Sequence, residues 1–204
     1  MKQSMLKGQW RPAIIGTVVL MILTGLLYPG LITGIAQVAF PRQANGSLVK
    51  VNGKVVGSAL IGQTFTKPWY FQGRPSATDN NAAASAGTNK GPTDAKLADT
   101  LITGAVAKAV EENGAVKGKV PSDMVTASAS GIDPHISPAN ARLQVARVAR
   151  ARGRTEAEVT SLLEARIEGR TFGLLGEPRV NVLLLNVALD SAFGGVRDTT
   201  TVTR

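Results

Sequence analysis

An apolar stretch near the N-terminus constrains this chain more than any other feature. Twenty-nine residues, from Pro12 to Phe40, carry no charge. At about 1.5 Å per residue, a helix of that length exceeds a bilayer hydrocarbon core of about 30 Å. A signal peptide has a shorter apolar region and a small-residue cleavage site, and a buried core helix seldom has so long an apolar run. The sequence therefore predicts one retained transmembrane helix over residues 12–38.

The charges around this helix indicate its orientation. The tail over residues 1–11 contains Lys2, Lys7 and Arg11 and no acid, which is typical of a cytoplasmic segment. Long domains cross the membrane largely regardless of their charge. We therefore expect a cytoplasmic tail, a single domain over residues 41–190 on the outer side, and a flexible Thr-rich tail over residues 191–204.

Small residues in the span suggest a helical partner. Gly30 and Gly34 form a GxxxG pair, and Gly16 and Gly25 add further positions where another helix could approach closely. Tyr28-Pro29-Gly30 predicts a kink or local unwinding, because proline cannot donate a helix hydrogen bond.

Composition excludes several kinds of site. The chain has a net charge of +9, no cysteine and one histidine. Disulfides, thiolate zinc sites, cysteine nucleophiles and multi-histidine metal sites are thus ruled out. The basic balance would suit nucleic acid, but an outward-facing anchored domain has little access to it, so an acidic protein or a membrane surface is the expected partner.

Turn and cap signals predict the first elements of the domain. Asn52-Gly53 between β-branched residues predicts a β-hairpin over residues 47–61. Thr93 as cap and Asp94 in the first turn are suited to a helix that ends near Asn113-Gly114.

Similar signals predict the later elements. Ser137-Pro138 begins a helix that Gly153 ends, and Thr155 with Glu158 forms a capping box for the next helix. The apolar run over residues 179–189 is interpreted as a central strand covered on both faces. Together these elements predict an α+β domain with a mostly antiparallel or mixed sheet.

Two clusters allow either a structural or a binding interpretation. Aromatic residues gather over 65–71, and we favour packing of the sheet over an interaction surface. Four arginines lie where the helix before Gly153 ends, and there we favour a solvated helix end over a docking patch, because cations complement the helix dipole. These are Arg147, Arg150, Arg152 and Arg154.

Three patterns are candidates for chemistry. Ser128 or Ser130 with Asp133 and His135 supplies the residue types of a hydrolase, but no Gly-x-Ser-x-Gly elbow surrounds the serines. The segment 87–93, which includes Lys90, could hold an anion at a helix N-terminus, but it lacks the Walker pattern. The third pattern is a surface rich in hydroxyl and carbonyl oxygens, which are ligands for hard cations. It comprises Ser76, Asp79, Asn80, Asn81 and the 126–133 loop.

Several segments resemble one family, the C subunit of the Kdp potassium-transporting ATPase, a bacterial P-type pump complex. The most specific is Gly131-Ile-Asp-Pro-His-Ile-Ser-Pro138, and the others are 71–77, 120–128, Gln144, 147–153, 176–182 and Leu185-Asn186. The resemblance covers nearly the whole chain to Asp190. Lys90, where the family usually has an apolar residue, Ala129, where a glycine is common, and the Thr-rich tail depart from the family pattern.

The resemblance implies an inner-membrane subunit with a periplasmic domain. Its partners would be a channel-like potassium-translocating subunit, the P-type catalytic subunit and a small single-helix subunit. It would stabilise the complex and support ATP binding, with ATP and K⁺ acting at the level of the complex and no tightly bound cofactor, catalytic residue or metal in this chain. A domain placed over the outer ion entrance would bring the two polar loops to the ion path. The residues concerned are Arg74, Ser76, Asp79, Thr126, Ser128, Asp133 and His135.

A membrane-anchored periplasmic hydrolase and a nucleotide-binding regulator remain the alternatives. The orientation of the span separates these hypotheses. In whole cells treated with an impermeant thiol reagent, we expect Ser85→Cys to be labelled and Ser4→Cys to be protected, and the native chain has no cysteine to add background. Labelling of Ser4→Cys alone would reverse the orientation, favour direct nucleotide binding and exclude a role at the outer ion entrance.

Overall fold

The computed structural model describes residues 8–91 and 93–196 of the 204-residue chain. It contains two compact units, Met1–Leu48 and Val49–Arg204. Most of the expected N-terminal tail and the Thr-rich residues 197–204 lie outside the described residues, so the predictions for both tails stay predictions.

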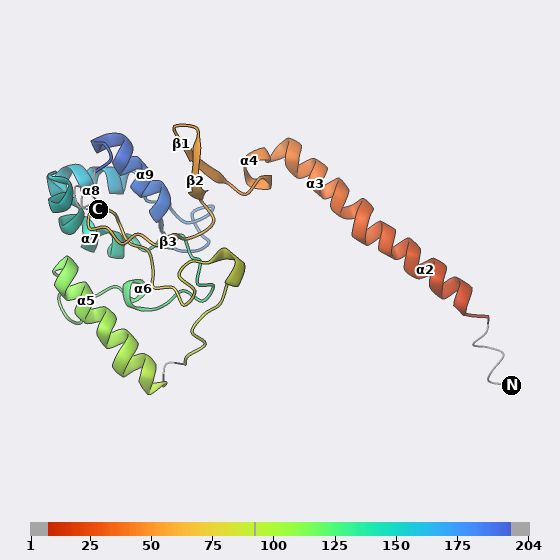
Figure 1. Ribbon diagram of the computed structural model, residues 1–204, viewed down its shortest axis with the longest axis horizontal. Coiled ribbons are helices and arrows are strands. Elements are labelled where there is room, and N and C mark those ends of the chain that lie inside the picture. Colours follow the sequence, from red (N-terminus) through yellow and green to blue (C-terminus); the bar gives the residue numbers. More distant parts are fainter. Residues whose placement is uncertain (1–7, 92, 197–204) are drawn as a thin grey trace, which may run out of the picture. The chain divides into compact units, whose positions relative to one another are not determined.

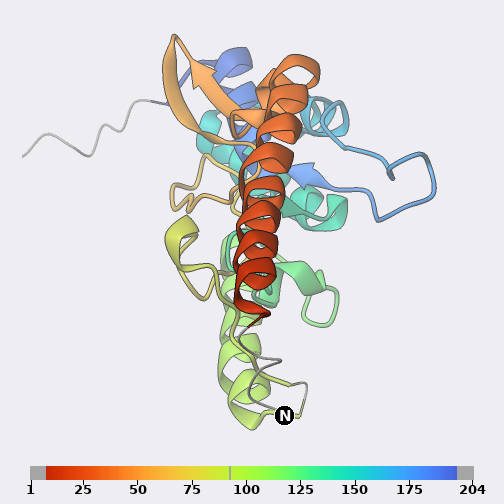
Figure 2. The same ribbon diagram turned by 90° about the vertical axis from the view of Figure 1, so that its right-hand side faces the viewer.

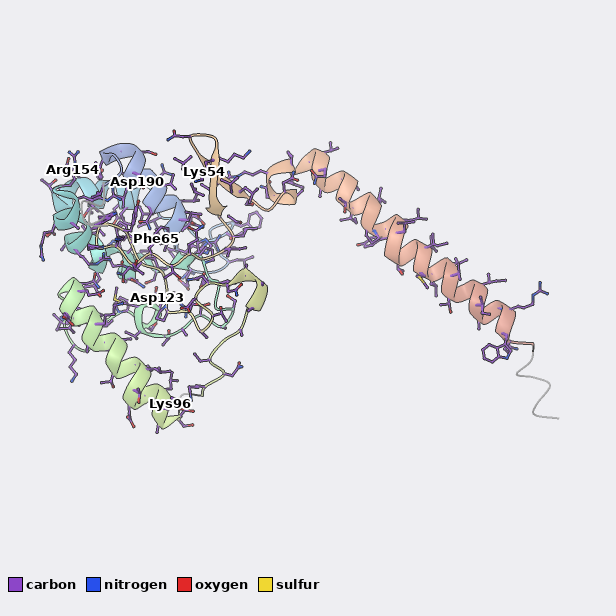
Figure 3. All side chains as sticks on the ribbon, viewed as in Figure 1. Lys54, Phe65, Lys96, Asp123, Arg154 and Asp190 are labelled. Carbon is purple, nitrogen blue, oxygen red and sulfur yellow. The ribbon has the colours of Figure 1, made fainter. Side chains whose placement is uncertain are left out.

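The first unit is dominated by one long helix. It consists of α2 (Trp10–Ile22), a π-helical turn (Leu23–Leu27) and α3 (Tyr28–Ala39), and the short helix α4 (Pro41–Ala44) follows. The stretch Trp10–Ala39 is long and apolar enough to cross a membrane. Figure 3 shows its side chains pointing outward along its length.

The irregularity expected near Pro29 is present as the π-helical turn. Tyr28 N–H donates to the carbonyl of Leu23, five residues earlier. Pro29 cannot donate to Gly25, and its ring would crowd that carbonyl in a regular helix. A wider turn immediately before the proline relieves this clash.

The second unit is an α+β domain, which confirms the predicted fold class. Its sheets are smaller than expected: β1 (Leu48–Val51) forms one two-stranded sheet with β2 (Lys54–Ser58), and β3 (His135–Ile136) pairs antiparallel with β4 (Val180–Asn181). The remaining elements are a 3₁₀ turn (Ala82–Ala84), a π-helical segment (Lys96–Ile102), α5 (Thr103–Asn113), α6 (Ser122–Val125), α7 (Pro138–Arg152), α8 (Glu156–Glu164) and α9 (Val182–Phe193).

Local signals account for several of these boundaries. Asn52 and Gly53 both have positive φ, 50° and 78°, as a type I′ hairpin turn requires. Ser137 Oγ accepts the N–H of Asn140 at the start of α7, and the predicted capping box of Thr155 opens α8. The hairpin and both caps are confirmed.

The helix predicted after Pro92 begins differently. Asp94 Oδ1, rather than the Thr93 side chain, accepts the N–H of Leu97, and the first turns are π-helical. The end is as predicted, because Gly114 adopts the left-handed conformation that stops α5.

The predicted central strand over residues 179–189 is wrong. Only Val180 and Asn181 form a strand, Arg179 makes an isolated bridge before it, and α9 follows directly, with Asn181 Oδ1 accepting the N–H of Leu184 as its cap. A buried helix and a buried strand are both apolar throughout, so periodicity does not separate them. The cap and the leucine content favour the helix.

The core lies between α7, α8 and α9, which Figure 1 shows side by side at one end of the domain. Val148, Leu163 and Leu185 are fully buried there. Phe71 is fully buried against them, which supports the packing interpretation of the aromatic cluster.

Side chains of α7 and α9 hold segment 68–72, a turn followed by irregular backbone, through its backbone N–H and C=O groups. Asn186 accepts the N–H of Phe71 and donates to its carbonyl, both at 2.9 Å. Gln144 pairs in the same way with Gln72, at 2.8 and 3.1 Å. We call this arrangement the amide clamp. Because an amide supplies an acceptor oxygen and two N–H donors, each clamp residue satisfies a full backbone pair, and Gln144 has a second N–H for Asn140.

Two arginines complete the attachment of this segment. Arg147 donates to the carbonyls of Pro68 and Tyr70, and Arg152 donates to that of Trp69 and pairs with Asp190 at 2.8 Å. Arg147 is buried and only 1% of the Arg152 side chain is exposed. The interpretation of the arginine cluster as a solvated helix end is therefore wrong for these two residues.

Removing one arm of the amide clamp tests its importance for stability. Asn186→Leu keeps a similar volume but leaves the N–H and C=O of Phe71 buried and unpaired. At about 1–3 kcal/mol for each of the two unsatisfied groups, we expect the free energy of unfolding to fall by about 2–6 kcal/mol. Urea unfolding of the full chain in detergent, followed by Trp fluorescence, measures this. The exposed Ser161→Ala on α8 should change stability by less than about 0.5 kcal/mol, and an equally small effect of Asn186→Leu would contradict the prediction.

Candidate functional site

The structure brings the two predicted polar loops together through Arg74. Arg74 Nη1 lies 3.1 Å from Asp133 Oδ2, and Nη2 donates to the carbonyls of Thr126 and Ala127 at 3.4 and 3.3 Å. One guanidinium from the first loop thus binds three positions of the second, which suits its fixed fork of donors.

Hydroxyl and backbone groups join the same loops. Ser76 Oγ donates to the carbonyl of Gly131 at 2.6 Å, and Ser128 N–H donates to the carbonyl of Pro75 at 3.0 Å. Gly131 has φ of +70°, and a Cβ there would lie 2.5 Å from the carbonyl oxygen of Ala86. The loops are packed too closely for any other residue at that position.

Asp133 is the main charged anchor of the second loop. The N–H of His135 donates to its Oδ1 at 2.9 Å, and His135 Nδ1 lies 3.7 Å from the same oxygen. Burial by itself raises the pKa of Asp133, but His135 and the Arg74 guanidinium outweigh it and hold that pKa below its usual value. The carboxylate is therefore ionised at neutral pH.

A cavity of about 410 Å³ lies beside the joined loops. Arg74, Ser76 and Asp79 line it, whereas Thr126, Ser128, Asp133 and His135 do not. The remaining lining residues are Gln63, Thr64, Phe65, Thr66, Gln72, Gly73, Pro75, Asn80, Ala105, Lys108, Ala109, Glu112, Asn113, Met124, Asn140 and Gln144.

The charges lining the cavity are largely paired. Arg74 binds Asp133, and Lys108 Nζ lies 3.7 Å from Glu112 Oε1. Among the described residues, no hydrogen bond or ion pair holds the carboxylate of Asp79, which leaves it available to a cation. The cavity offers carboxylate, hydroxyl and amide oxygens, the ligand types that suit hard cations.

The other two chemical hypotheses find little support. Ser128 is 3% exposed and its Oγ accepts the N–H of Gly131, and among the described residues no hydrogen bond links either candidate serine to the His135 ring. Lys90 Nζ donates to Asp94 Oδ2 at 2.8 Å, so a carboxylate already occupies the proposed anion position. Within residues 8–91 and 93–196, no group of three or more His, Asp or Glu is placed to hold a metal ion.

The sequence did not predict that two buried amides of α7 line the cavity. Gln144 and Asn140 are 2% and 1% exposed, and Gln144 Nε2 donates to Asn140 Oδ1 at 2.8 Å. Asn140 in turn donates to Asp123, which also accepts the N–H and hydroxyl of Ser137. Asn140 and Gln144 are four residues apart and so lie on the same side of a helix. This spacing, beside the apolar stripe of α7, could have predicted that the two amides interact.

Comparison with known proteins identifies close relatives. A family model described as KdpC, K⁺-transporting ATPase, c chain, matches residues 10–191. A protein of Gemmatimonas aurantiaca named potassium-transporting ATPase KdpC subunit is 57% identical over 184 residues, 89% of this chain and 92% of that protein. Proteins with the same name from Myxococcus xanthus and Caulobacter vibrioides are 56% and 52% identical, over 89% and 90% of this chain and 87% and 93% of theirs.

The depressed pKa of Asp133 predicts acid sensitivity of the joined loops. A carboxyl whose folded pKa lies below its unfolded value stabilises the fold above the unfolded value, and this contribution is lost as pH falls through the folded pKa. We expect Asp133→Asn to be less stable than the parent at pH 6, with the difference shrinking below the ordinary value of 3.8. Urea unfolding from pH 6 to pH 3 measures this, with Glu111→Gln on α5 as control. A difference independent of pH would contradict it.

Proposed function

The chain belongs to the KdpC family, the c chain of K⁺-transporting ATPases, and on this basis we propose that it stabilises the pump complex and covers the outer entrance of the ion path. It is a membrane-associated subunit, and residues 8–91 and 93–196 contain one helix long enough to span the bilayer. Membership of the family supports assembly of this chain with other pump subunits. The oxygen-lined cavity beside Asp79 is the observation that supports a position near the ion path.

We further propose three neighbours for this subunit: a channel-like potassium-translocating subunit, the P-type catalytic subunit and a small single-helix subunit. Gly16, Gly25, Gly30 and Gly34 would provide the close contacts with a neighbouring helix. A Cβ built at each of these glycines meets nothing within 4 Å in this chain, so space for a partner is open there.

The proposed location is the bacterial inner membrane, with the domain in the periplasm. The basic residues before the span favour that orientation. K⁺ would then approach the domain from outside, and the cavity beside Asp79 would face the side from which a pump with high affinity collects its ion.

We propose that this chain supports ATP binding and turnover indirectly, without a tightly bound cofactor of its own. Phosphates are usually held by unpaired cations and exposed backbone N–H groups. Arg74 and Lys108 in the cavity are each beside a carboxylate, and Lys90 is bound to Asp94. ATP and K⁺ would therefore act at the level of the complex, and the influence on ATP would pass through contacts with the catalytic subunit.

Substituting the cavity carboxylate tests the ion-entrance proposal. We expect Asp79→Ala to raise the apparent KM for K⁺ of the assembled pump by up to about fivefold, the ratio that corresponds to about 1 kcal/mol of charge attraction at 4 Å in water. Asp133→Ala should also raise it, through release of Arg74 and movement of the first loop. Potassium-dependent ATPase activity of the purified complex measures both.

A matched control removes the same charge elsewhere. Glu111 lies on the exposed side of α5 and does not line the cavity. The pump with Glu111→Ala should therefore have the same apparent KM for K⁺ as the parent. An unchanged KM for Asp79→Ala in a fully assembled complex would exclude a role for this cavity in ion approach.

A further inference from the structure

The loop between α8 and β4 carries an exposed apolar tip. Phe172, Leu174 and Leu175 are 90%, 79% and 63% exposed, which is unusual for large apolar side chains grouped within four residues. Figure 2 shows this segment, coloured blue, projecting from the domain as a long loop. Neither the core nor the cavity described above uses these three side chains.

Backbone pairing holds the projecting loop in one conformation. Glu168 and Arg179 form a bridge with reciprocal hydrogen bonds of 2.8 and 3.0 Å, and Thr171 pairs with Leu175 closer to the tip. Phe172 has φ of +55°, a conformation that is costly for a bulky residue. Such strain persists where the surrounding structure enforces it and is common at binding sites.

Ion pairs surround the base of the tip. Arg170 Nη2 lies 2.8 Å from both carboxylate oxygens of Glu177, and Arg179 Nε lies 3.0 Å from Glu168 Oε2. The two arginine charges are thereby balanced by two carboxylates. The apolar tip therefore rises from a base of two arginines and two glutamates with no net charge. We call these four residues, Glu168, Arg170, Glu177 and Arg179, the collar.

These features favour a protein pocket over a lipid surface. Loops that bind bilayers use unpaired lysine and arginine to attract anionic headgroups, whereas here the cations of the collar are balanced and the Glu177 side chain is 77% exposed. A fluid bilayer does not require a fixed loop, but preorganisation strengthens binding to a pocket of fixed shape. Aromatic anchors inserted in such pockets often dominate an interface.

We propose that this tip, Phe172 with Leu174 and Leu175, inserts into an apolar pocket on another subunit of the pump. The pocket would accept a phenyl ring and two leucines, and its rim would be polar and without excess charge, to match the collar. This inference rests on the proposed function for the existence of partner subunits. It concerns a surface distinct from the cavity beside Asp79.

Site-specific photocrosslinking in the assembled pump tests the proposal. A photoreactive phenylalanine analogue is placed at Phe172, and at Val116 as a control, because Val116 is also apolar and 62% exposed but lies in a different loop. The intact complex is irradiated in membranes, purified and analysed by mass. We expect an adduct with another pump subunit from position 172 and none from position 116.

Each other result has a definite meaning. An adduct with lipid or with a second copy of this chain, or no adduct in an intact pump, would overturn the inference and leave the proposed function standing. A chain that does not copurify with pump subunits even without the analogue would overturn the proposed function, and this inference with it.

Truncation of the tip supplies a second measurement. The triple variant F172A/L174A/L175A removes side chains that lie outside the core, so the fold should persist, which circular dichroism checks. Because truncation of such anchors commonly weakens association about tenfold or more, we expect retention of this chain in the detergent-solubilised complex to fall about tenfold. Leu60→Ala, at another exposed leucine, should leave retention unchanged, and equal retention of the triple variant would contradict the proposal.

Discussion

The domain depends on side chains that replace a sheet as partners for a buried backbone. Segment 68–72 makes a turn and then runs against the core without regular secondary structure, and no strand pairs with it among the described residues. Its polar groups are instead satisfied by the amide clamp and by two arginines. Buried backbone groups must be paired, so α7 and α9 supply amides and guanidinium groups from their inward faces. This explains how so little strand structure supports an ordered domain.

The same arrangement connects the core to the cavity. Gln144 holds Gln72, accepts from Arg147 and donates to Asn140, whose amide reaches Asp123. The first polar loop begins immediately after the clamped segment, so its starting point is fixed by α7. Arg74 and Ser76 then bind the second loop. Within the described residues, Arg74 Nε is buried without a hydrogen-bond partner, but the other groups named here are paired, and paired buried polar groups favour one arrangement. The position of the cavity wall therefore follows from packing in the core.

Local rules predicted much of this domain because they act over a few residues. Asn52-Gly53 requires positive φ angles whatever surrounds it, and the Thr155 capping box satisfies N–H groups within one helical turn. The two loops that carry the candidate site were also recognised, since Arg74, Ser76 and Asp133 all take part in their junction. Which loop lines the cavity could not be predicted, because that depends on contacts between residues more than fifty positions apart.

The sequence by itself determined the long apolar helix, the cap residues and the α+β class, because these follow from hydrophobic length and short-range hydrogen bonding. Only the tertiary structure decided that residues 182–193 form a helix, since Leu184 and Val187 on its less buried side are as apolar as the buried positions and the run shows no clear period. Only the tertiary structure, too, decided that Arg147 and Arg152 are buried and that Phe172 is exposed. An arginine becomes an interior residue when distant carbonyls meet its donors, and a phenylalanine remains outside when the loop that carries it is held away from the core.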